Sequence, residues 1–137
     1  SRRRFFNLVR THTSMISNWV LVALGGGLGA VLRFAVSEAI PSEDVPWATL
    51  SVNLVGSLLL GAMTAAVATQ VMSESQAMFL GMGLLGAFTT MSTYSVETIG
   101  LIEDGKWRVA VAYVLLTAAA GPILAWIGWK SGNAMLA

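Results

Sequence analysis

The chain has 137 residues, of which 55% are hydrophobic and only 11% are charged, which is far from the balance of a water-soluble domain. The mean hydropathy of +0.72 likewise indicates an integral membrane protein, and the length suits a single domain. A formal net charge of +1 argues against a nucleic-acid partner, and the lack of cysteine excludes disulfides and thiolate chemistry.

Four windows are long and apolar enough to cross a bilayer, which takes roughly 20 mostly apolar residues. They cover about residues 19–40, 48–72, 77–102 and 109–129, and short polar connections join them. We therefore expect an all-α integral membrane protein with four transmembrane helices. Residues 19–137 form its membrane domain, and residues 1–18 form a basic N-terminal extension.

The extension carries four arginines, at positions 2, 3, 4 and 10. A basic stretch before an apolar one also begins signal peptides, and Ser37-Glu38-Ala39 has the small residues of a cleavage site. The apolar stretch is longer than a signal core and contains a glycine-rich run at 25–29, so we expect the first span to stay. The positive flanking residues favour a cytoplasmic N-terminus, but without the extension this bias almost disappears.

The first span ends near Arg33, after the glycine-rich run. No strand precedes that run, so a phosphate-binding loop is excluded, and the small residues instead allow a neighbouring helix to approach closely. Arg33 either extends its charge to the membrane surface or supplies positive potential at the mouth of an anion path. The sequence leaves both interpretations open.

The second span places Thr49, Asn53 and Ser57 on one helical face, because they recur every fourth residue. Hydroxyls in membrane helices commonly join neighbouring helices by hydrogen bonds. Asn53 differs, since an amide near mid-span is harder to bury and offers two N–H donors to an anion.

The third span is interrupted by a glycine and hydroxyl cluster at residues 86–95. Lipid cannot satisfy free backbone groups, so such a break is stable only if it is buried in protein or lines an aqueous path. A break frees backbone carbonyls of the kind that coordinate hard alkali cations, whereas the hydroxyls can donate to an anion. The rings of Phe88 and Tyr94 also have positive edges that suit an anion.

The fourth span has Tyr113 and Thr117 on one face, ahead of Gly121-Pro122. Each has an ordinary alternative role, Tyr113 as an interfacial anchor and Thr117 as a hydroxyl bonded to its own helix. Together they extend a polar track through the spans.

Nothing in the sequence resembles a catalytic site. The chain has a single histidine, in the extension, and Glu97 is the only acid well inside the spans. A nucleophile would have no base and a transition metal would have too few ligands, so we do not expect an enzyme.

Three motifs together point to one family. The first is the glycine-rich run that leads to Arg33-Phe34, and the second is Thr49-Leu-Ser-Val-Asn53-Leu-Val-Gly56. The third is Gly86-Ala-Phe-Thr-Thr-Met-Ser-Thr-Tyr-Ser-Val-Glu97. In these motifs the chain resembles the fluoride channels of the Fluc (CrcB) type, over about residues 25–129.

The resemblance implies an antiparallel, dual-topology dimer in the cell (plasma) membrane, with a third helix broken mid-membrane. Fluoride would leave the cytoplasm passively through two pores, which gives fluoride resistance. A structural sodium ion at the dimer centre would be held by the backbone carbonyls of Gly86 and Thr89. The partners are then fluoride, the lipid bilayer and a second copy of the chain. Because the basic extension suits dual topology poorly, a heterodimer with a paralogous subunit is the alternative.

The resemblance also assigns residues to the fluoride pathway. Asn53 matches the pore-lining amide, Arg33 the vestibule arginine, and Glu97 the acid that closes the third motif. Met91 and Tyr94 stand where the family has two pore-lining phenylalanines, and methionine lacks a ring edge while tyrosine adds a hydroxyl. The remaining members of the pathway are hydroxyl residues: Thr49, Thr90, Ser92, Thr93, Tyr113 and Thr117.

Two other functions compete with a fluoride channel. A small proton-coupled multidrug exporter needs an acid deep in the first span, and residues 19–32 contain none. A non-transporting assembly subunit would confine its polar residues to one contact face, whereas here they occur in three spans.

Overall fold

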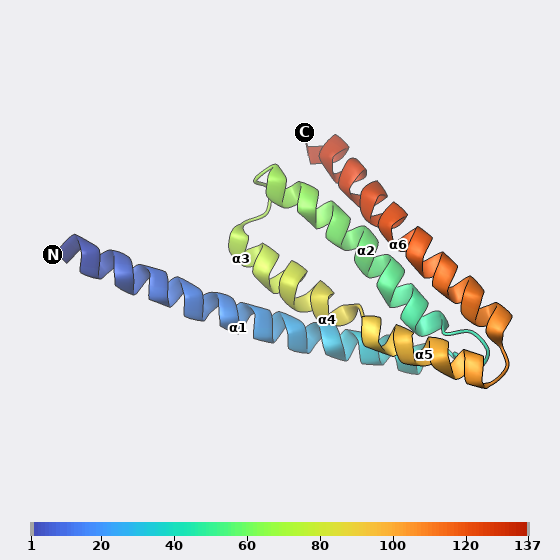
Figure 1. Cartoon of the computed structure of the whole chain (residues 1–137). Helices are drawn as coiled ribbons and strands as arrows, with labels where there is room; N and C mark the ends of the chain where they lie inside the picture. Colours follow the sequence, from blue (N-terminus) through green and yellow to red (C-terminus); the bar gives the residue numbers. More distant parts are fainter. Residues whose placement is uncertain (1, 137) are drawn as a thin grey trace.

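The computed structural model describes the backbone of residues 2–136 and the side chains of residues 17–136, and this part of the chain is all-helical (Figure 1). Three segments are long and apolar enough to cross a membrane: Ser17–Ala39, Trp47–Ala68 and Trp107–Leu136. The predicted all-α class is therefore confirmed. In chain order the elements are α1 (Arg2–Ala39), α2 (Trp47–Ala68), α3 (Glu74–Gln76), the π-helix η1 (Ala77–Leu85), α4 (Gly86–Phe88), α5 (Met91–Glu103) and α6 (Trp107–Leu136).

The third predicted span is a broken helix. α3, η1 and α4 follow one another without a gap up to Phe88, and α5 starts at Met91. Between them Thr89 and Thr90 are extended, with ψ angles of 156° and 119°. The break thus falls inside the hydroxyl cluster that predicted it. The count of four crossings depends on this broken segment and stays a prediction.

The ends of the other helices differ from the predicted spans. α1 continues through the N-terminal extension as one helix, although the side chains of the four extension arginines lie outside the described residues. α2 ends at Ala68, because the chain turns just after it and Gln70 has a positive φ of 59°. α6 runs on to Leu136 with Pro122 inside it.

The helices form two pairs. α1 lies along η1 and α4, and α2 lies along α6 (Figure 1). The pairs converge at the end where the loops before α2 and α6 turn, and they diverge toward the two chain termini. At the converging end the Nζ of Lys106 contacts the Oδ1 of Asp44 at 3.1 Å.

Glycines allow the close approach within each pair. Gly29 of α1 is buried, and a Cβ there would collide with the backbone oxygen of Leu84 in η1. Gly61 of α2 faces the backbone oxygen of Ala125 in α6 in the same way. The small residues of the first span therefore serve helix packing, as the sequence predicted.

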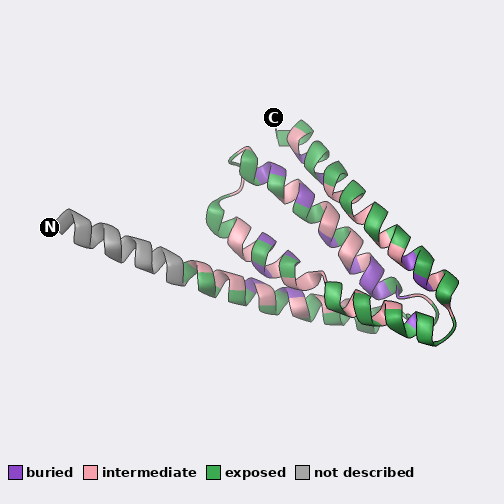
Figure 2. Cartoon of the chain, in the orientation of Figure 1, coloured by how far each residue is buried: buried purple, intermediate pink, exposed green. Residues whose placement is uncertain are grey.

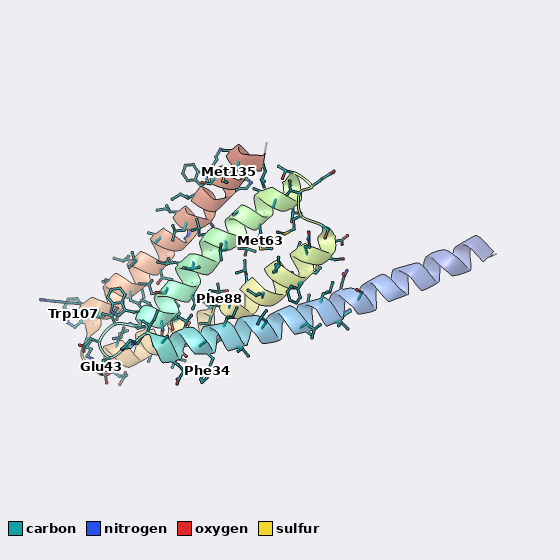
Figure 3. The ribbon with its side chains drawn as sticks, turned by 180° about the vertical axis from the view of Figure 1, so that it is seen from behind. Phe34, Glu43, Met63, Phe88, Trp107 and Met135 are labelled. Atoms are coloured by element: carbon teal, nitrogen blue, oxygen red, sulfur yellow. The ribbon has the colours of Figure 1, made fainter. Side chains whose placement is uncertain are left out.

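Large apolar side chains cover the outside of the bundle. Trp19 is 77% exposed and Phe34 64%, and Figure 3 shows Phe34 and Met135 pointing away from the ribbon. Buried residues are confined to the inner faces of the helices (Figure 2). Apolar surface of this extent is typical of a protein that faces lipid or another subunit.

Replacing Gly29 with alanine is expected to lower the free energy of unfolding by about 1–3 kcal/mol, the usual cost of overpacking. The added methyl group meets the backbone oxygen of Leu84, which cannot move without displacing η1. Thermal unfolding in detergent measures the effect.

Gly27→Ala is the matched control, because a Cβ at Gly27 meets nothing within 4 Å. If both variants unfold at the temperature of the wild type, the close contact between α1 and η1 is not a constraint on stability.

Candidate functional site

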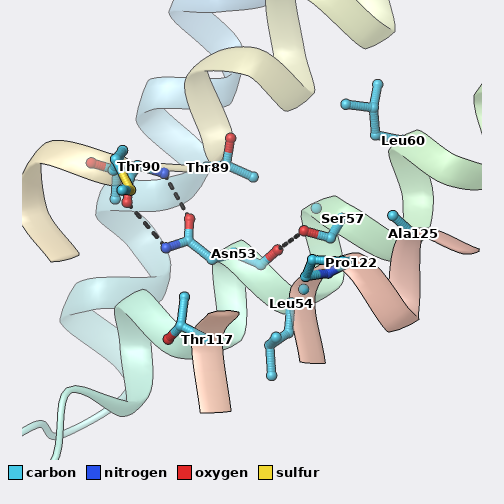
Figure 4. A pocket seen from close by; sticks show the side chains of 12 residues that line it. Asn53, Leu54, Ser57, Leu60, Thr89, Thr90, Thr117, Pro122 and Ala125 are labelled. Atoms are coloured by element: carbon cyan, nitrogen blue, oxygen red, sulfur yellow. Dashed lines mark hydrogen bonds between the residues drawn. The ribbon is translucent and has the colours of Figure 1, made fainter. Parts of the chain in front are cut away.

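Asn53 of α2 holds the break between α4 and α5. Its Nδ2 donates to the backbone oxygen of Thr90 at 3.0 Å, and its Oδ1 accepts from the Thr90 N–H at 2.8 Å (Figure 4). In a continuous helix the Thr90 N–H would donate to the carbonyl of Gly86, four residues earlier. The Asn53 side chain therefore gives the Thr90 N–H the acceptor that the break removes, and it also donates to the Thr90 carbonyl.

Thr90 also caps α5. Its Oγ1 accepts from the N–H of Thr93 at 3.2 Å and donates to the Oγ1 of Thr93 at 3.0 Å. Hydroxyl residues favour this position because the first amides of a helix have no partner within it. In a continuous helix the Thr93 N–H would bond the carbonyl of Thr89, so the cap separates that carbonyl from its partner as well.

The break leaves carbonyl oxygens at the end of α4 without helical partners. Those of Gly86 and Thr89 have no hydrogen bond to any described residue. The oxygen of Ala87 instead accepts from the Nε of Arg33, at 3.0 Å. Arg33 is thus bonded to α4, just before the break, an arrangement that neither sequence interpretation included.

Glu97 of α5 joins three helices. The Thr49 hydroxyl of α2 donates to its Oε1 at 2.8 Å, and the Tyr113 hydroxyl of α6 donates to its Oε2 at 2.9 Å. Thr49 and Tyr113 are both buried, and the rings of Tyr94 and Tyr113 pack 5.0 Å apart at 60°. The acid that the sequence singled out is half-buried and accepts one hydrogen bond on each carboxylate oxygen.

A cavity of about 420 Å³ opens beside the break, between α2, α5 and α6 (Figure 4). The Oγ1 of Thr117 is buried and has no hydrogen-bond partner among the described residues. The cavity is lined by Asn53, Leu54, Gly56, Ser57, Leu60, Thr89, Thr90, Met91, Thr117, Gly121, Pro122 and Ala125.

A second cavity, of about 220 Å³, shares Thr90 with the first. It has charged groups of both signs, from Arg33 and Glu97, where the first cavity has none. Its lining is Arg33, Phe34, Ser37, Ser42, Ala48, Thr49, Val52, Thr90, Thr93 and Glu97.

These cavities gather most, but not all, of the residues that the sequence assigned to the site. Tyr94 and Tyr113 border neither cavity and pack on each other, while Ser92 is exposed. Met91 borders the first cavity but remains 73% exposed. Sequence reasoning missed Ser42, whose Oγ accepts from the Ala48 N–H at 3.2 Å, because a loop serine carries no periodic signal.

Tyr113→Phe is expected to lower the free energy of unfolding by about 1–2 kcal/mol, because it leaves one oxygen of the half-buried Glu97 carboxylate without its donor. Tyr94→Phe is the matched control, since the Tyr94 hydroxyl makes no hydrogen bond to a described residue. Denaturation in mixed micelles compares the two variants. Equal stability of both would contradict a stabilising Glu97 network.

Comparison with known proteins identifies the family. The family profile described as "CrcB-like protein, Camphor Resistance (CrcB)" matches residues 20–129. A protein of Idiomarina loihiensis, named "Fluoride-specific ion channel FluC", is 43% identical over 104 residues, which cover 74% of this chain and 81% of that protein.

A Thermus thermophilus protein of the same name is 35% identical over 124 residues, which cover 88% of this chain and 98% of that protein. The family match includes α2 with Asn53, the broken helix with Thr90, and the part of α6 that carries Tyr113 and Thr117. The chain therefore belongs to the CrcB-like family of membrane proteins.

Proposed function

We propose that this chain is a passive fluoride-selective ion channel that lowers cytoplasmic fluoride. The observation that carries the proposal is the cavity at the helix break, which is lined by the Asn53 amide and by hydroxyl groups. The name shared by the two relatives agrees with it.

The chemistry of this cavity suits a small, strongly hydrated anion. A pore must replace part of the ion's water by hydrogen-bond donors, yet bind it weakly enough for release. Neutral amide and hydroxyl groups meet both needs, whereas a lysine or arginine in the cavity would hold the anion. Export needs no energy coupling, since a negative-inside potential favours the outward movement of a monovalent anion by about 2.3 kcal/mol per 100 mV.

A structural sodium ion fits the other face of the break. The carbonyl oxygens of Gly86 and Thr89 lack hydrogen bonds to described residues, and such oxygens are the ligands of hard alkali cations in membrane proteins. No cluster of acidic, histidine or cysteine side chains that could hold a metal occurs in the described part of the chain. Gly86 and Thr89 would hold the ion, which would supply positive charge at the break and is not itself transported.

Two copies of the chain would assemble as an antiparallel pair. The chain exposes large apolar faces on both helix pairs, and the Gly86 and Thr89 carbonyls supply only part of the coordination that a sodium ion needs. A second copy would cover the apolar faces and supply the remaining ligands of the sodium ion. The broken segment would then be the fourth crossing of the plasma membrane. If the basic extension fixes one orientation, a paralogous subunit takes the place of the second copy.

An exporter coupled to protons is the weaker candidate. Its mechanism needs an acid in the first span that a substrate can reach, and α1 has none between residues 19 and 32. Glu97 lies instead on α5 and already accepts two hydrogen bonds. A channel also needs no catalytic group, in agreement with the expectation that the chain is not an enzyme.

Liposomes that contain the purified chain are expected to release trapped fluoride when a potential is applied, and to retain trapped chloride. A fluoride electrode records the release, and protein-free liposomes are the control. No fluoride-selective release from this chain alone would exclude a homodimeric channel, and release only with a paralogous subunit would establish the heterodimer.

Replacing sodium by N-methylglucamine on both sides of the membrane is expected to slow fluoride release, because the Gly86 and Thr89 carbonyls would lose the charge that compensates them. Chain stability in detergent should fall in parallel, and readdition of sodium should restore both. Release that is the same in the two cations would refute the sodium site.

A further inference from the structure

A groove of about 320 Å³ lies between α2 and α6, near the end where the two helix pairs converge. Among the described residues it shares none with the two cavities at the break. All of its lining belongs to α2, to α6 or to the loop before α2, and so lies outside the broken helix. The lining is Val45, Trp47, Leu50, Arg108, Val109, Ala112, Tyr113 and Leu116.

The inner surface of this groove is apolar. Leu50 and Tyr113 are buried and form its floor, and the Tyr113 hydroxyl donates to Glu97, so only the ring faces the groove. Trp47 is 52% exposed and Leu116 46%, so the groove opens to the outside of the bundle. An open apolar surface of this kind marks contact with membrane lipid or with another protein.

The groove begins at the membrane surface and ends inside one leaflet. Trp47 and Trp107 are the first residues of α2 and α6, and aromatic residues concentrate at the boundary between membrane and water. From Arg108 to Leu116 the helix rises about 12 Å. The hydrocarbon core is about 30 Å thick, so this depth stays within the half of the bilayer nearest to Arg108. A lipid chain of that leaflet therefore matches the length and direction of the groove.

Arg108 is the one charged residue among those that line the groove, and it stands at the end near the membrane surface. Its guanidinium carbon lies 5.5 Å from the centre of the Trp107 ring, and it has no acidic partner in the described part of the chain. Lys106 differs, because it is paired with Asp44. A guanidinium presents a planar fork of N–H donors that matches a phosphate group. An unpaired arginine at the mouth of an apolar groove therefore suits an amphiphile with a phosphate head.

The charges around Arg108 favour a headgroup with no net charge. The two loops at this end and the helix ends beside them carry more acids than bases, and Figure 3 shows Glu43 at the same end as Trp107. A net negative headgroup would be repelled by this surplus, whereas a zwitterionic one adds an ammonium group that the acids attract. The exposed acids are Glu43, Asp44, Glu103 and Asp104, and the bases are Lys106 and Arg108.

We propose that one zwitterionic phospholipid binds between α2 and α6, with its phosphate on Arg108 and an acyl chain along the groove toward Leu116. Its ammonium group faces the acids of the loops. The second copy of the chain would complete the sodium site at the broken helix, to which no described groove residue belongs. Lipid and second copy therefore use different elements of the protein.

Three lipids with identical acyl chains test the headgroup. The full chain, freed of lipid in detergent, is mixed with phosphatidylethanolamine, with phosphatidylglycerol or with a galactosyl diacylglycerol that has no phosphate. Native mass spectrometry counts the lipids retained, and thermal unfolding measures the stabilisation. Phosphatidylethanolamine is expected to bind roughly tenfold or more tightly than the galactolipid, because hydrogen bonds to charged groups are the stronger ones.

Arg108→Gln removes the charge and keeps much of the side-chain stem. It is expected to weaken phosphatidylethanolamine binding roughly tenfold or more and to leave galactolipid binding unchanged. Lys130→Gln is the matched control, since Lys130 lies 5.4 Å from the centre of the Trp129 ring but does not border the groove.

Ala112→Phe fills the groove and is expected to lower the retention of all three lipids. Ala119→Phe is its control, because Ala119 is also exposed and lies two turns further along the same face of α6, outside the groove. If phenylalanine prevents folding, leucine at the same two positions gives the same comparison.

Each outcome decides for or against the lipid site. Weaker binding by Arg108→Gln and by Ala112→Phe, with both controls unchanged, supports it. Equal binding of the three lipids, or tighter binding of phosphatidylglycerol than of phosphatidylethanolamine, overturns the zwitterionic phospholipid. If Ala112→Phe instead separates a dimer into single chains and leaves lipid retention as it was, the groove is covered by a second copy and the proposal is wrong.

Discussion

The two hydrogen bonds between the Asn53 side chain and the backbone N–H and carbonyl of Thr90 are the interaction on which the site depends. They satisfy the Thr90 N–H, which the break leaves without a helical acceptor and which lipid could not satisfy. Without them the Thr90 N–H could return to Gly86 and α4 could run on into α5. The break, the cap of α5 and the cavity all follow from this contact between α2 and the broken helix.

One interruption supplies two opposite kinds of group. Its N-terminal side ends in carbonyl oxygens, which attract cations, and its C-terminal side begins with free N–H groups, which attract anions. Arg33 takes one of those carbonyls, that of Ala87, and leaves those of Gly86, Phe88 and Thr89 without a hydrogen bond to a described residue. The separation of charge at the site therefore comes mainly from backbone, so the proposed ion path does not need many charged side chains.

Much of this could be predicted from the sequence because it depends on local pattern. Apolar runs predicted the helices, and hydroxyls inside such a run predicted the break near residue 89. Contacts between helices could not be predicted in this way, because spacing along one helix does not say which face meets a neighbour. The Thr90 partner of Asn53 is 37 residues away and the Glu97 partner of Thr49 is 48 residues away. The π-helix η1 and the end of α2 at Ala68 also differ from the predicted spans.

The atoms of Thr90 that Asn53 binds belong to the main chain. These two hydrogen bonds therefore constrain the residue type at position 53 and not at position 90. Any residue except proline could present the same N–H and carbonyl at position 90. No other side chain could replace Asn53, because aspartate has no donor and glutamine is one methylene longer. The side chains of Met91 and Tyr94 take no part in these two hydrogen bonds, so the residue types at positions 91 and 94 do not affect them directly.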